Sequence, residues 1–430
     1  MTHYVVMDAE PAASAQAAPV RAHWLDAERL RVYPRIFLAA YAVAAVGYAL
    51  SLHDGLDFRG QVLGADFITF YSAGTLALAG RGASAWDFDV LLPAQQLLFP
   101  AYAGLGFPWF YPPPFLLLVA PLALLPYLGA LAVFVGSTAT AWALTLRRAI
   151  RRQGAGWLVA AFPGLWACAA QGQNGLLTAA LAGGSILALR RRPVLSGVLL
   201  GLLIIKPHLA VLFAVALVAG RAWRTMLVAA GTAIACLGAS TLVLGRGALT
   251  AWLGSLPLAS AATESGALPW TKMPSVFAML RLLGASVEAA YTVHWMVAAA
   301  AAIGVWLVWR RSDSVELRGA ALMTATFLAN PHVHDYDLAW LAFPIAWLAL
   351  YGLAHGWRRG DREVLVSAWL VPVVATAFAT ASRVQVAPLV LAALLWIVVR
   401  RVDIRPPVGF DRLSQHWAGL SRRWAGLSQR

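Results

Sequence analysis

The residue whose type and setting best suit acid–base catalysis is Asp66. It follows a Gly-Ala pair and precedes an apolar, aromatic run at 67–74 (FITFYSAG). A carboxylate in such surroundings can accept a proton from a sugar or alcohol hydroxyl, because desolvation raises its pKa toward a working value. The alternatives are a solvated loop aspartate and a helix N-cap.

A second motif joins aromatic residues to prolines at 108–114 (PWFYPPP). Consecutive prolines force the chain into an extended entry to the following helix. The aromatic faces could stack on pyranose rings or contact a lipid chain. An aromatic belt at the membrane interface is the alternative.

Lys206 and Lys272 are the only lysines in the chain. Lys206 lies between two short apolar segments, where an ammonium group is costly without an anion. A phosphate of a lipid-linked ligand would be such an anion. Snorkelling of the side chain to the membrane surface is the alternative.

Residues 330–337 (NPHVHDYD) bring two histidines and two aspartates into one short turn. His and Asp bind metal ions, yet the turn has no HExxH or comparable fixed spacing, so we predict no metal site. The histidines could donate hydrogen bonds to a phosphate or to sugar hydroxyls. A capped turn that enters a helix at Leu338 is the alternative.

The elements that position these groups must be membrane helices. The chain has 430 residues, of which 60% are hydrophobic and 12% charged. A soluble domain is about half apolar and about a quarter charged. This composition excludes soluble enzyme folds.

The formal net charge of +14 would suggest nucleic-acid binding in a soluble chain. Here the arginines form short clusters between apolar runs, which is the pattern of cytoplasmic loops under the positive-inside rule. We therefore expect membrane lipids, and no nucleic acid, as partners. Cys168 and Cys236 fall in apolar segments and are expected to be small core residues.

A helix needs about 20 apolar residues to cross a bilayer. The first apolar run, 36–52, follows three arginines and should cross from the cytoplasm to the outside as an uncleaved insertion signal; no cleavable signal peptide is recognisable. A long first outer loop at 53–113 should follow. The next apolar stretch, 115–146, is interrupted by prolines and should form a kinked or partly interfacial helix.

Beyond it, arginine clusters recur, and a polar group splits each intervening apolar stretch. We predict an all-α polytopic protein of the inner (cell) membrane with about 12 spans and both termini cytoplasmic. Several spans are short or interrupted, which is tolerated where the backbone is buried or lines a cavity. The polar groups should converge from the outer, periplasmic or equivalent, side; they lie at 171–174, 206–208, 264–272, 330–337 and 382–383.

This topology divides the chain into a cytoplasmic segment (1–33), a transmembrane domain (34–405) and a tail (406–430). The tail repeats Trp-Ala-Gly-Leu-Ser beside several arginines. Tryptophans on a basic amphipathic stretch suit the lipid interface. A poorly ordered tail is the alternative.

The motifs, in this order, resemble glycosyltransferase family 87, a family of the GT-C superfamily of polytopic transferases that use polyprenyl-phosphate sugars. The resemblance spans most of the chain and rests on five short motifs. These are the Asp66 stretch, Tyr111-Pro112-Pro113, Gly172-Gln173-Asn174, Gly197-x-x-x-Gly201 leading to Lys206-Pro207, and Pro331-His332-x-His334-x-Tyr336-Asp337.

The resemblance implies a GT-C-type fold and inverting transfer of a hexose, typically mannose, from polyprenyl phosphate to a lipid or glycan hydroxyl. Asp66 would be the general base, as an acidic residue of the first outer loop. Lys206, His332, His334 and Arg383 would bind the donor phosphate. No cofactor is expected. The lipid phosphate is already a good leaving group, so no general acid is strictly needed. Residues expected at the sugar or acceptor are Tyr71, Tyr111, Gln173, Asn174, Asp335 and Asp337.

Two rival functions deserve comparison. A flippase or transporter of lipid-linked sugars tends to show internal repeats and ionisable residues near the bilayer midplane. The short helices around Lys206 are compatible with it, but the halves show no repeat and the acids cluster in outer loops. A glycan polymerase or ligase would rely on outer arginines, which are few.

Overall fold

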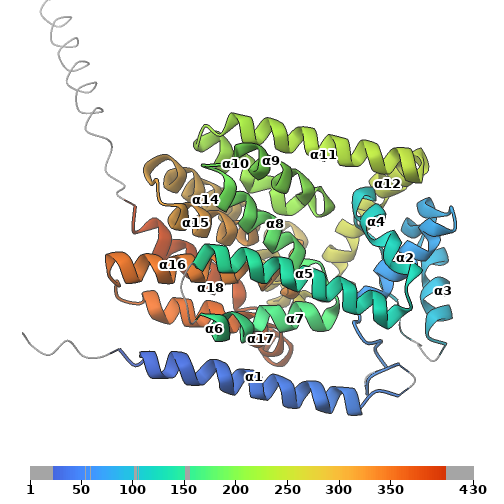
Figure 1. The fold of residues 1–430 in the computed structure, drawn as a ribbon, viewed down its shortest axis with the longest axis horizontal. Helices are drawn as coiled ribbons and strands as arrows, with labels where there is room; N and C mark the ends of the chain where they lie inside the picture. The colour runs from blue at the N-terminus through green and yellow to red at the C-terminus, as the bar shows by residue number, and fades with distance from the viewer. Residues whose placement is uncertain are drawn as a thin grey trace, which may run out of the picture.

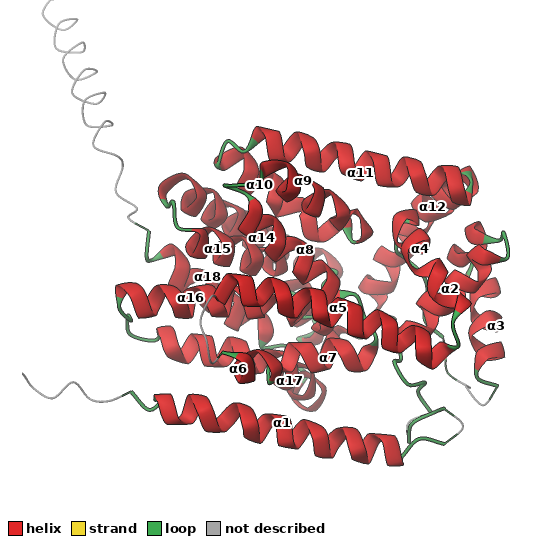
Figure 2. Cartoon of the chain, in the orientation of Figure 1, coloured by secondary structure: helices red, strands yellow, loops and turns green. Residues whose placement is uncertain are grey.

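The computed structural model describes residues 23–53, 55–58, 60–100, 104, 106–150 and 155–402. The predicted tail at 406–430 and most of the predicted segment at 1–33 lie outside the described residues. Within the described part the chain is helical and contains no extended strand (Figure 2). The predicted all-α class of a polytopic membrane protein is confirmed.

Six described segments are long and apolar enough to cross a bilayer: α1 (Ala27–Leu50), α5 (Tyr127–Ile150), α11 (Trp223–Leu244), α14 (Val287–Arg311), η6 (Asp335–Leu341) continued by α16 (Ala342–His355), and α17 (Asp361–Ser382). The shorter apolar segments are α2 (Phe67–Leu78), α4 (Pro113–Val119) with η2 (Ala120–Leu124), α8 (Gly175–Ala188), α9 (Pro193–Gly201) with η3 (Leu202–Ile205), η4 (Pro207–Ala210) with α10 (Val211–Ala219), and α18 (Ala387–Val399). The remaining helices are η1 (Gly82–Trp86), α3 (Phe88–Leu98), α6 (Gly156–Ala160), α7 (Pro163–Gln171), α12 (Arg246–Ser265), η5 (Trp270–Lys272), α13 (Val276–Leu282) and α15 (Val315–Leu328).

The interior is built around α15 and η6. Every residue of η6 is buried, and so is every residue of α15 from Gly319 onward. A helix that is buried on all sides carries no polar face to water. Because η6 also contacts α7, α8 and α17, the turn that precedes it is held at the centre of the molecule.

Glycines permit two close backbone contacts that place the motif-bearing helices. A Cβ on Gly175 would lie 2.3 Å from the carbonyl oxygen of Tyr336, so only glycine lets α8 begin against η6. A Cβ on Gly201 would lie 2.6 Å from the carbonyl oxygen of Ala229. The Gly-x-x-x-Gly motif therefore brings α9 against α11, as small residues do between membrane helices.

The structure adds detail to two predicted segments. The predicted first outer loop at 53–113 contains α2, η1 and α3, which fold around buried aromatic side chains. The kinked or partly interfacial helix predicted at 115–146 is divided into α4, η2 and α5. Proline lacks the amide proton that a continuous helix needs, and Pro121 and Pro126 stand at the start of η2 and just before α5.

Most helices run along one direction, with α1 at one edge and α11 at the opposite edge (Figure 1). Helices α2, α3 and α4 gather at one end, and the described chain begins and ends at the other (Figure 1). There His23 lies 3.2 Å from Glu363, and Arg400 and Arg401 form ion pairs with Asp361. The two ends of the described chain therefore meet at the start of α17.

Candidate active site

Asp66 immediately precedes α2 but does not cap it with its side chain. Instead its Oδ2 accepts a hydrogen bond of 2.8 Å from Nε2 of Gln173, which lies in the turn between α7 and α8. Asp66 keeps some accessible surface, and its Oδ1 has no hydrogen-bond partner among the described residues. The N-cap alternative for this residue is thus not realised, and one carboxylate oxygen is available to a ligand.

The orientation of Gln173 is fixed by its other end. Its Oε1 accepts hydrogen bonds from the Tyr111 hydroxyl at 3.0 Å and from the Asn174 backbone N–H at 3.2 Å. These two contacts decide which end of the Gln173 amide is the oxygen. In the reverse orientation the amide N–H groups would face the Asn174 N–H, a donor facing a donor. The amide nitrogen must then face Asp66. Tyr111, Gln173 and Asp66 form one chain of hydrogen bonds.

A tight turn at Gly172 positions Gln173. Gly172 has φ of +61°, and a Cβ there would lie 2.6 Å from Cβ of Phe67. Glycine adopts this left-handed conformation without strain, so α7 can end directly beside the start of α2. This packing places a residue of the α7–α8 turn within hydrogen-bonding reach of Asp66.

Gln171, on the other side of the same glycine, serves a second carboxylate. Its Nε2 lies 3.2 Å from Oδ1 of Asp335, and its Oε1 accepts from Nζ of Lys272 at 3.3 Å. The Thr376 hydroxyl lies 3.2 Å from Oδ2 of Asp335. The turn between α7 and α8 therefore holds two carboxylates, one through each glutamine.

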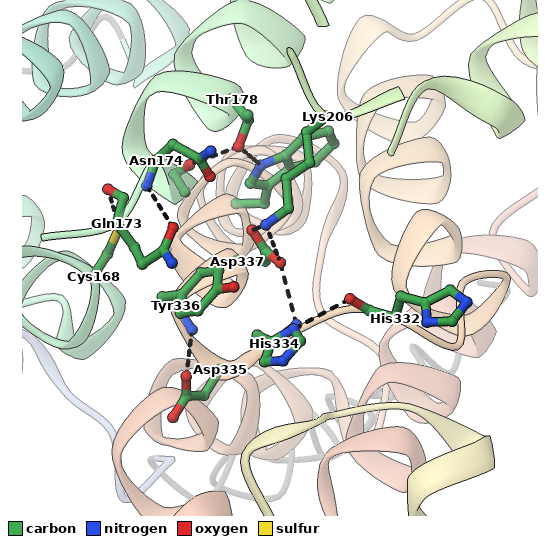
Figure 3. Close-up of polar contacts among 12 residues, drawn as sticks. Cys168, Gln173, Asn174, Thr178, Lys206, His332, His334, Asp335, Tyr336 and Asp337 are labelled. Carbon is green, nitrogen blue, oxygen red and sulfur yellow. Dashed lines mark hydrogen bonds and ion pairs between the residues drawn. The ribbon is translucent and has the colours of Figure 1, made fainter. Parts of the chain in front are cut away.

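Lys206 and Asp337 form a buried ion pair (Figure 3). Nζ of Lys206 lies 2.6 Å and 2.8 Å from the two carboxylate oxygens and 4.6 Å from the centre of the Tyr336 ring. Lys206 is only 4% exposed, so its side chain does not snorkel. The anion that this ammonium requires is supplied by the protein itself.

His334 and His332 extend the network from the same turn. The backbone N–H of His334 donates to Oδ2 of Asp337 at 3.2 Å, and its Nδ1 lies 3.2 Å from the His332 carbonyl (Figure 3). Its ring stacks on Tyr336. The turn is thus capped and hydrogen-bonded, as the structural alternative predicted. The His334 imidazole lies beside the polar network, whereas Nδ1 of His332 lies 3.0 Å from the Thr263 hydroxyl.

Burial sets the charge of the titratable groups in these loops. It raises the pKa of Asp66, and the Gln173 hydrogen bond and the charge of Lys272 oppose that effect. Burial lowers the pKa of His334 to about 3 and also lowers the pKa of His332. Both histidines are therefore neutral at pH 7 in the unliganded protein, and Asp66 is more basic than an exposed aspartate.

The structure thus brings together nearly all the sequence-predicted residues. Asn174 lies beside Gln173, fully buried, and neither its Oδ1 nor its Nδ2 has a partner in the described structure. Tyr71 and Arg383 lie elsewhere. The Tyr71 hydroxyl donates to the Leu125 carbonyl at 2.8 Å, and Arg383 is exposed at the end of α17.

Sequence reasoning did not select several residues of this network. Gln171 belongs to the same polar group as Gln173, and Lys272 is one of only two lysines, so each carried a signal. Tyr336 belongs to the motif at 331–337 but was not selected as a site residue. Thr376 carried no signal, because its role depends on a contact between distant segments. The described residues contain no cluster of three or more metal-ligating side chains.

The fold and the site define a polytopic membrane protein whose polar loops meet at buried carboxylates. The family model of glycosyltransferase family 87 matches residues 109–331, just over half of the chain. The chain belongs to this family and is a membrane glycosyltransferase. Neither curated proteins nor solved structures give a significant match.

Proposed function

We propose that this glycosyltransferase moves a hexose, with mannose the first candidate, from a polyprenyl-phosphate donor to a hydroxyl of a lipid or glycan acceptor. The observation that carries the proposal is Asp66, a partly buried carboxylate with one oxygen held by Gln173 and the other without a hydrogen-bond partner among the described residues. Such a group suits general-base catalysis in a water-poor site.

In the proposed reaction the free Oδ1 of Asp66 takes the proton of the acceptor hydroxyl. The acceptor oxygen forms a bond to the anomeric carbon as the bond between that carbon and the phosphate oxygen breaks. The electron pair leaves with the phosphate, which needs no proton to depart. Attack from the face opposite the leaving group inverts the anomeric configuration.

The sugar and acceptor residues of the proposal are Tyr111, Gln173, Asn174, Asp335 and Asp337, with Tyr71 further out on α2. Gln173 has the strongest support, because its amide is hydrogen-bonded to both Asp66 and Tyr111.

On the phosphate side, we assign His332 and His334 to stabilising charge on the leaving group. Lys206 is already paired with Asp337. It therefore acts on the phosphate through its electrostatic field and not as a free ammonium that could bind the phosphate directly. Arg383 is retained as a peripheral phosphate contact on the outer surface. Neutral imidazoles next to an arriving anion would gain protons, because the anion favours their charged form.

The same proposal places the transferase in the inner (cell) membrane, with both termini cytoplasmic and the site on the extracytoplasmic side. The ends of the described chain support this orientation, because they meet at the start of α17, where Arg400 and Arg401 form ion pairs with Asp361. The domain division into 1–33, 34–405 and 406–430 follows from it.

The test is a transfer assay on purified protein in nanodiscs. It pairs a panel of polyprenyl-phosphate hexoses with a lipid extract from the source, for wild type and Asp66→Asn. We expect labelled glycolipid only with wild type. Turnover by Asp66→Asn would remove Asp66 from the base role, and movement of labelled lipid across proteoliposomes without transfer would replace the proposal with a transporter.

A further inference from the structure

Lys272 is the one lysine that the proposed reaction does not use. It is the last residue of η5 and is partly buried. Its Nζ lies 3.3 Å from Oε1 of Gln171, and no carboxylate of the described residues forms a direct ion pair with it. A partly buried ammonium group without a direct counterion depends on negative charge slightly further away.

The short helix η5 is tied to two other parts of the molecule. Nε1 of Trp270 donates to the Thr263 carbonyl in α12 at 2.6 Å. The Thr271 carbonyl accepts a hydrogen bond of 2.9 Å from Nε2 of Gln385, which lies between α17 and α18 and is buried. These contacts fix the backbone that carries Lys272, so its ammonium group is held beside the turn between α7 and α8.

That turn connects the ammonium group to two carboxylates. Gln171 contacts Lys272 through its oxygen and Asp335 through its nitrogen. Gln173 donates to Asp66. One residue separates the two glutamines, so their Cα atoms are at most about 7.6 Å apart. The ammonium group and both carboxylates therefore border the same turn.

The charges around this turn do not balance in pairs. Lys206 already has its counterion, because its Nζ lies 2.6 Å from Asp337. Figure 3 shows Asp335 and Asp337 on different sides of the turn that carries them. Two carboxylates, Asp66 and Asp335, are then left with one ammonium group, that of Lys272.

The charge of Lys272 acts on Asp66 together with several other groups. Burial raises the pKa of Asp66, and the Gln173 hydrogen bond and the charge of Lys272 lower it. Negative charge on Asp335 raises the same pKa. The titratable neighbours of Asp66 are the lysines Lys272 and Lys206, the carboxyl group of Asp335, and the hydroxyls of Tyr111, Tyr127 and Tyr336.

We propose that Lys272 is a positioning residue of the transfer reaction, whose ammonium group is the counterion shared by Asp66 and Asp335 and keeps Asp66 ready to accept a proton. This inference rests on the proposed function, because it requires Asp66 to be the base. Both oxygens of Asp335 already accept hydrogen bonds, one from Gln171 and one from Thr376. Asp66 is therefore the carboxylate with an oxygen to offer, and Lys272 acts through its charge without touching the reacting atoms.

The experiment measures kcat/KM against pH for the full chain in nanodiscs, with the polyprenyl-phosphate hexoses and lipid extract of the transfer assay. Lys272→Met should move the acidic limb to higher pH, because the carboxylate of Asp66 loses a favourable charge. Lys272→Arg should keep the limb at its wild-type position. On the plateau above the limb, Lys272→Met should lose less than about 100-fold, the smallest effect typical of removing a general base.

Asp335→Asn should shift the limb in the opposite direction. The asparagine oxygen can keep the hydrogen bonds from Gln171 and the Tyr336 backbone, and the Thr376 hydroxyl can accept from the new amide. Negative charge is therefore lost with little change in hydrogen bonding, and the limb should move to lower pH. The double variant with Lys272→Met should return toward the wild-type position, because opposite charges are removed together.

Arg246→Met is the matched control for net charge. Arg246 is exposed at the start of α12 and is not among the charged neighbours of Asp66. Its loss should leave the acidic limb in place. Melting temperatures in the same detergent show which variants fold. If Lys272→Met does not fold, Lys272→Gln replaces it, because glutamine keeps a donor without the charge.

Three outcomes would overturn the role of Lys272. These are an acidic limb that stays in place without the Lys272 charge, a limb that moves the same way in Asp335→Asn, and a Lys272→Arg variant that behaves like Lys272→Met. Each of them leaves Asp66 as the base if wild type shows the limb. Turnover by Asp66→Asn, or a wild type without an acidic limb, would instead overturn the base assignment of the proposed function, and the role of Lys272 would fall with it.

Discussion

At the scale of single residues, the chemistry depends on how Asp66 is held. Its oxygen atoms are not equivalent, because one accepts a hydrogen bond from the Gln173 amide and the other accepts none from the described residues. Burial makes the carboxylate more basic than an exposed one. These two facts give direct expectations for pH dependence and for substitution.

For the wild-type enzyme we expect kcat/KM to fall on acidification, with an apparent pKa above the ordinary aspartate value of about 3.9. The sign follows because a raised pKa keeps Asp66 protonated, and inactive as a base, to a higher pH. Initial rates across the pH range would measure this. A profile without an acidic limb would contradict the base assignment.

Asp66→Asn should lose transfer while its thermal stability equals or exceeds that of wild type above pH 6. A carboxyl whose folded-state pKa is raised is favoured in the protonated form, so ionised Asp66 destabilises the fold at higher pH. Asparagine removes that charge. Unfolding in detergent, followed by intrinsic fluorescence, would report it, and a clear loss of stability would show a structural role.

Gln173→Leu should lower kcat by up to about 100-fold through misplacement of the base. It should also raise the apparent pKa on the acidic limb, because the lost hydrogen bond favoured the carboxylate. Gln95→Leu is the control. Gln95 is buried and makes two hydrogen bonds with the Phe107 backbone, so its loss should lower stability and leave the pH profile in place.

At the scale of helices, close contacts bring the polar turns together. Gly172 and Gly175 end α7 and begin α8 against α2 and η6, and Gly201 seats α9 on α11. Lys206 lies at the break between η3 and η4, where its side chain pairs with Asp337, the third residue of η6. The site is assembled from helix ends, where the backbone can approach closely.

Gly201→Val should destabilise the protein, whereas Gly231→Val should not. A side chain at Gly201 meets the backbone of α11, and overpacking of this kind costs about 1–3 kcal/mol or more. Gly231 lies on α11 with nothing within 4 Å of its Cβ position. Comparison of the two melting temperatures separates packing from helix propensity. Equal shifts would contradict the α9–α11 contact.

Lys206→Met alone and Asp337→Leu alone should each cost about 3–5 kcal/mol, because each leaves a buried charge without its partner. The double variant should recover most of that stability and still lack activity. Unfolding of the three variants in the same detergent is the measurement. A double variant no more stable than the single ones would show that the two groups are not mutual counterions.

At the scale of the whole molecule, the length of α17 can be compared with the thickness of the membrane that it is proposed to cross. It has 22 residues, which at 1.5 Å per residue is about 33 Å, close to the thickness of the hydrocarbon layer. Arg359 and Ser382 are exposed near its opposite ends. The proposed orientation puts Arg359 in the cytoplasm and Ser382 outside.

In a background with Cys236→Ala, Ser382→Cys should react with a membrane-impermeant maleimide in intact cells or spheroplasts. Arg359→Cys should react only after permeabilisation, because it lies at the arginine-rich end of α17, which we place in the cytoplasm. Labelling followed by mass shift is the readout. The reverse pattern would invert the topology and move the site to the cytoplasmic face.

The sequence by itself determined the membrane setting, the helical class and the family. These follow from composition and short motifs, which are local properties of the chain. The polar groups at 171–174, 206–208 and 330–337 were predicted to converge, because short polar breaks inside apolar stretches must be buried or line a cavity. The hydrogen bonds among them confirm that prediction.

Only the tertiary structure decided which group partners which. Gln173 reaches Asp66 across 107 positions, and Lys206 reaches Asp337 across 131. No periodicity encodes such pairings, since they depend on where glycines let backbones approach and on which side chain fills the remaining space. From the sequence we expected Lys206 to bind a lipid phosphate. In the structure its ammonium group pairs with Asp337, because a buried ammonium without a counterion is too costly.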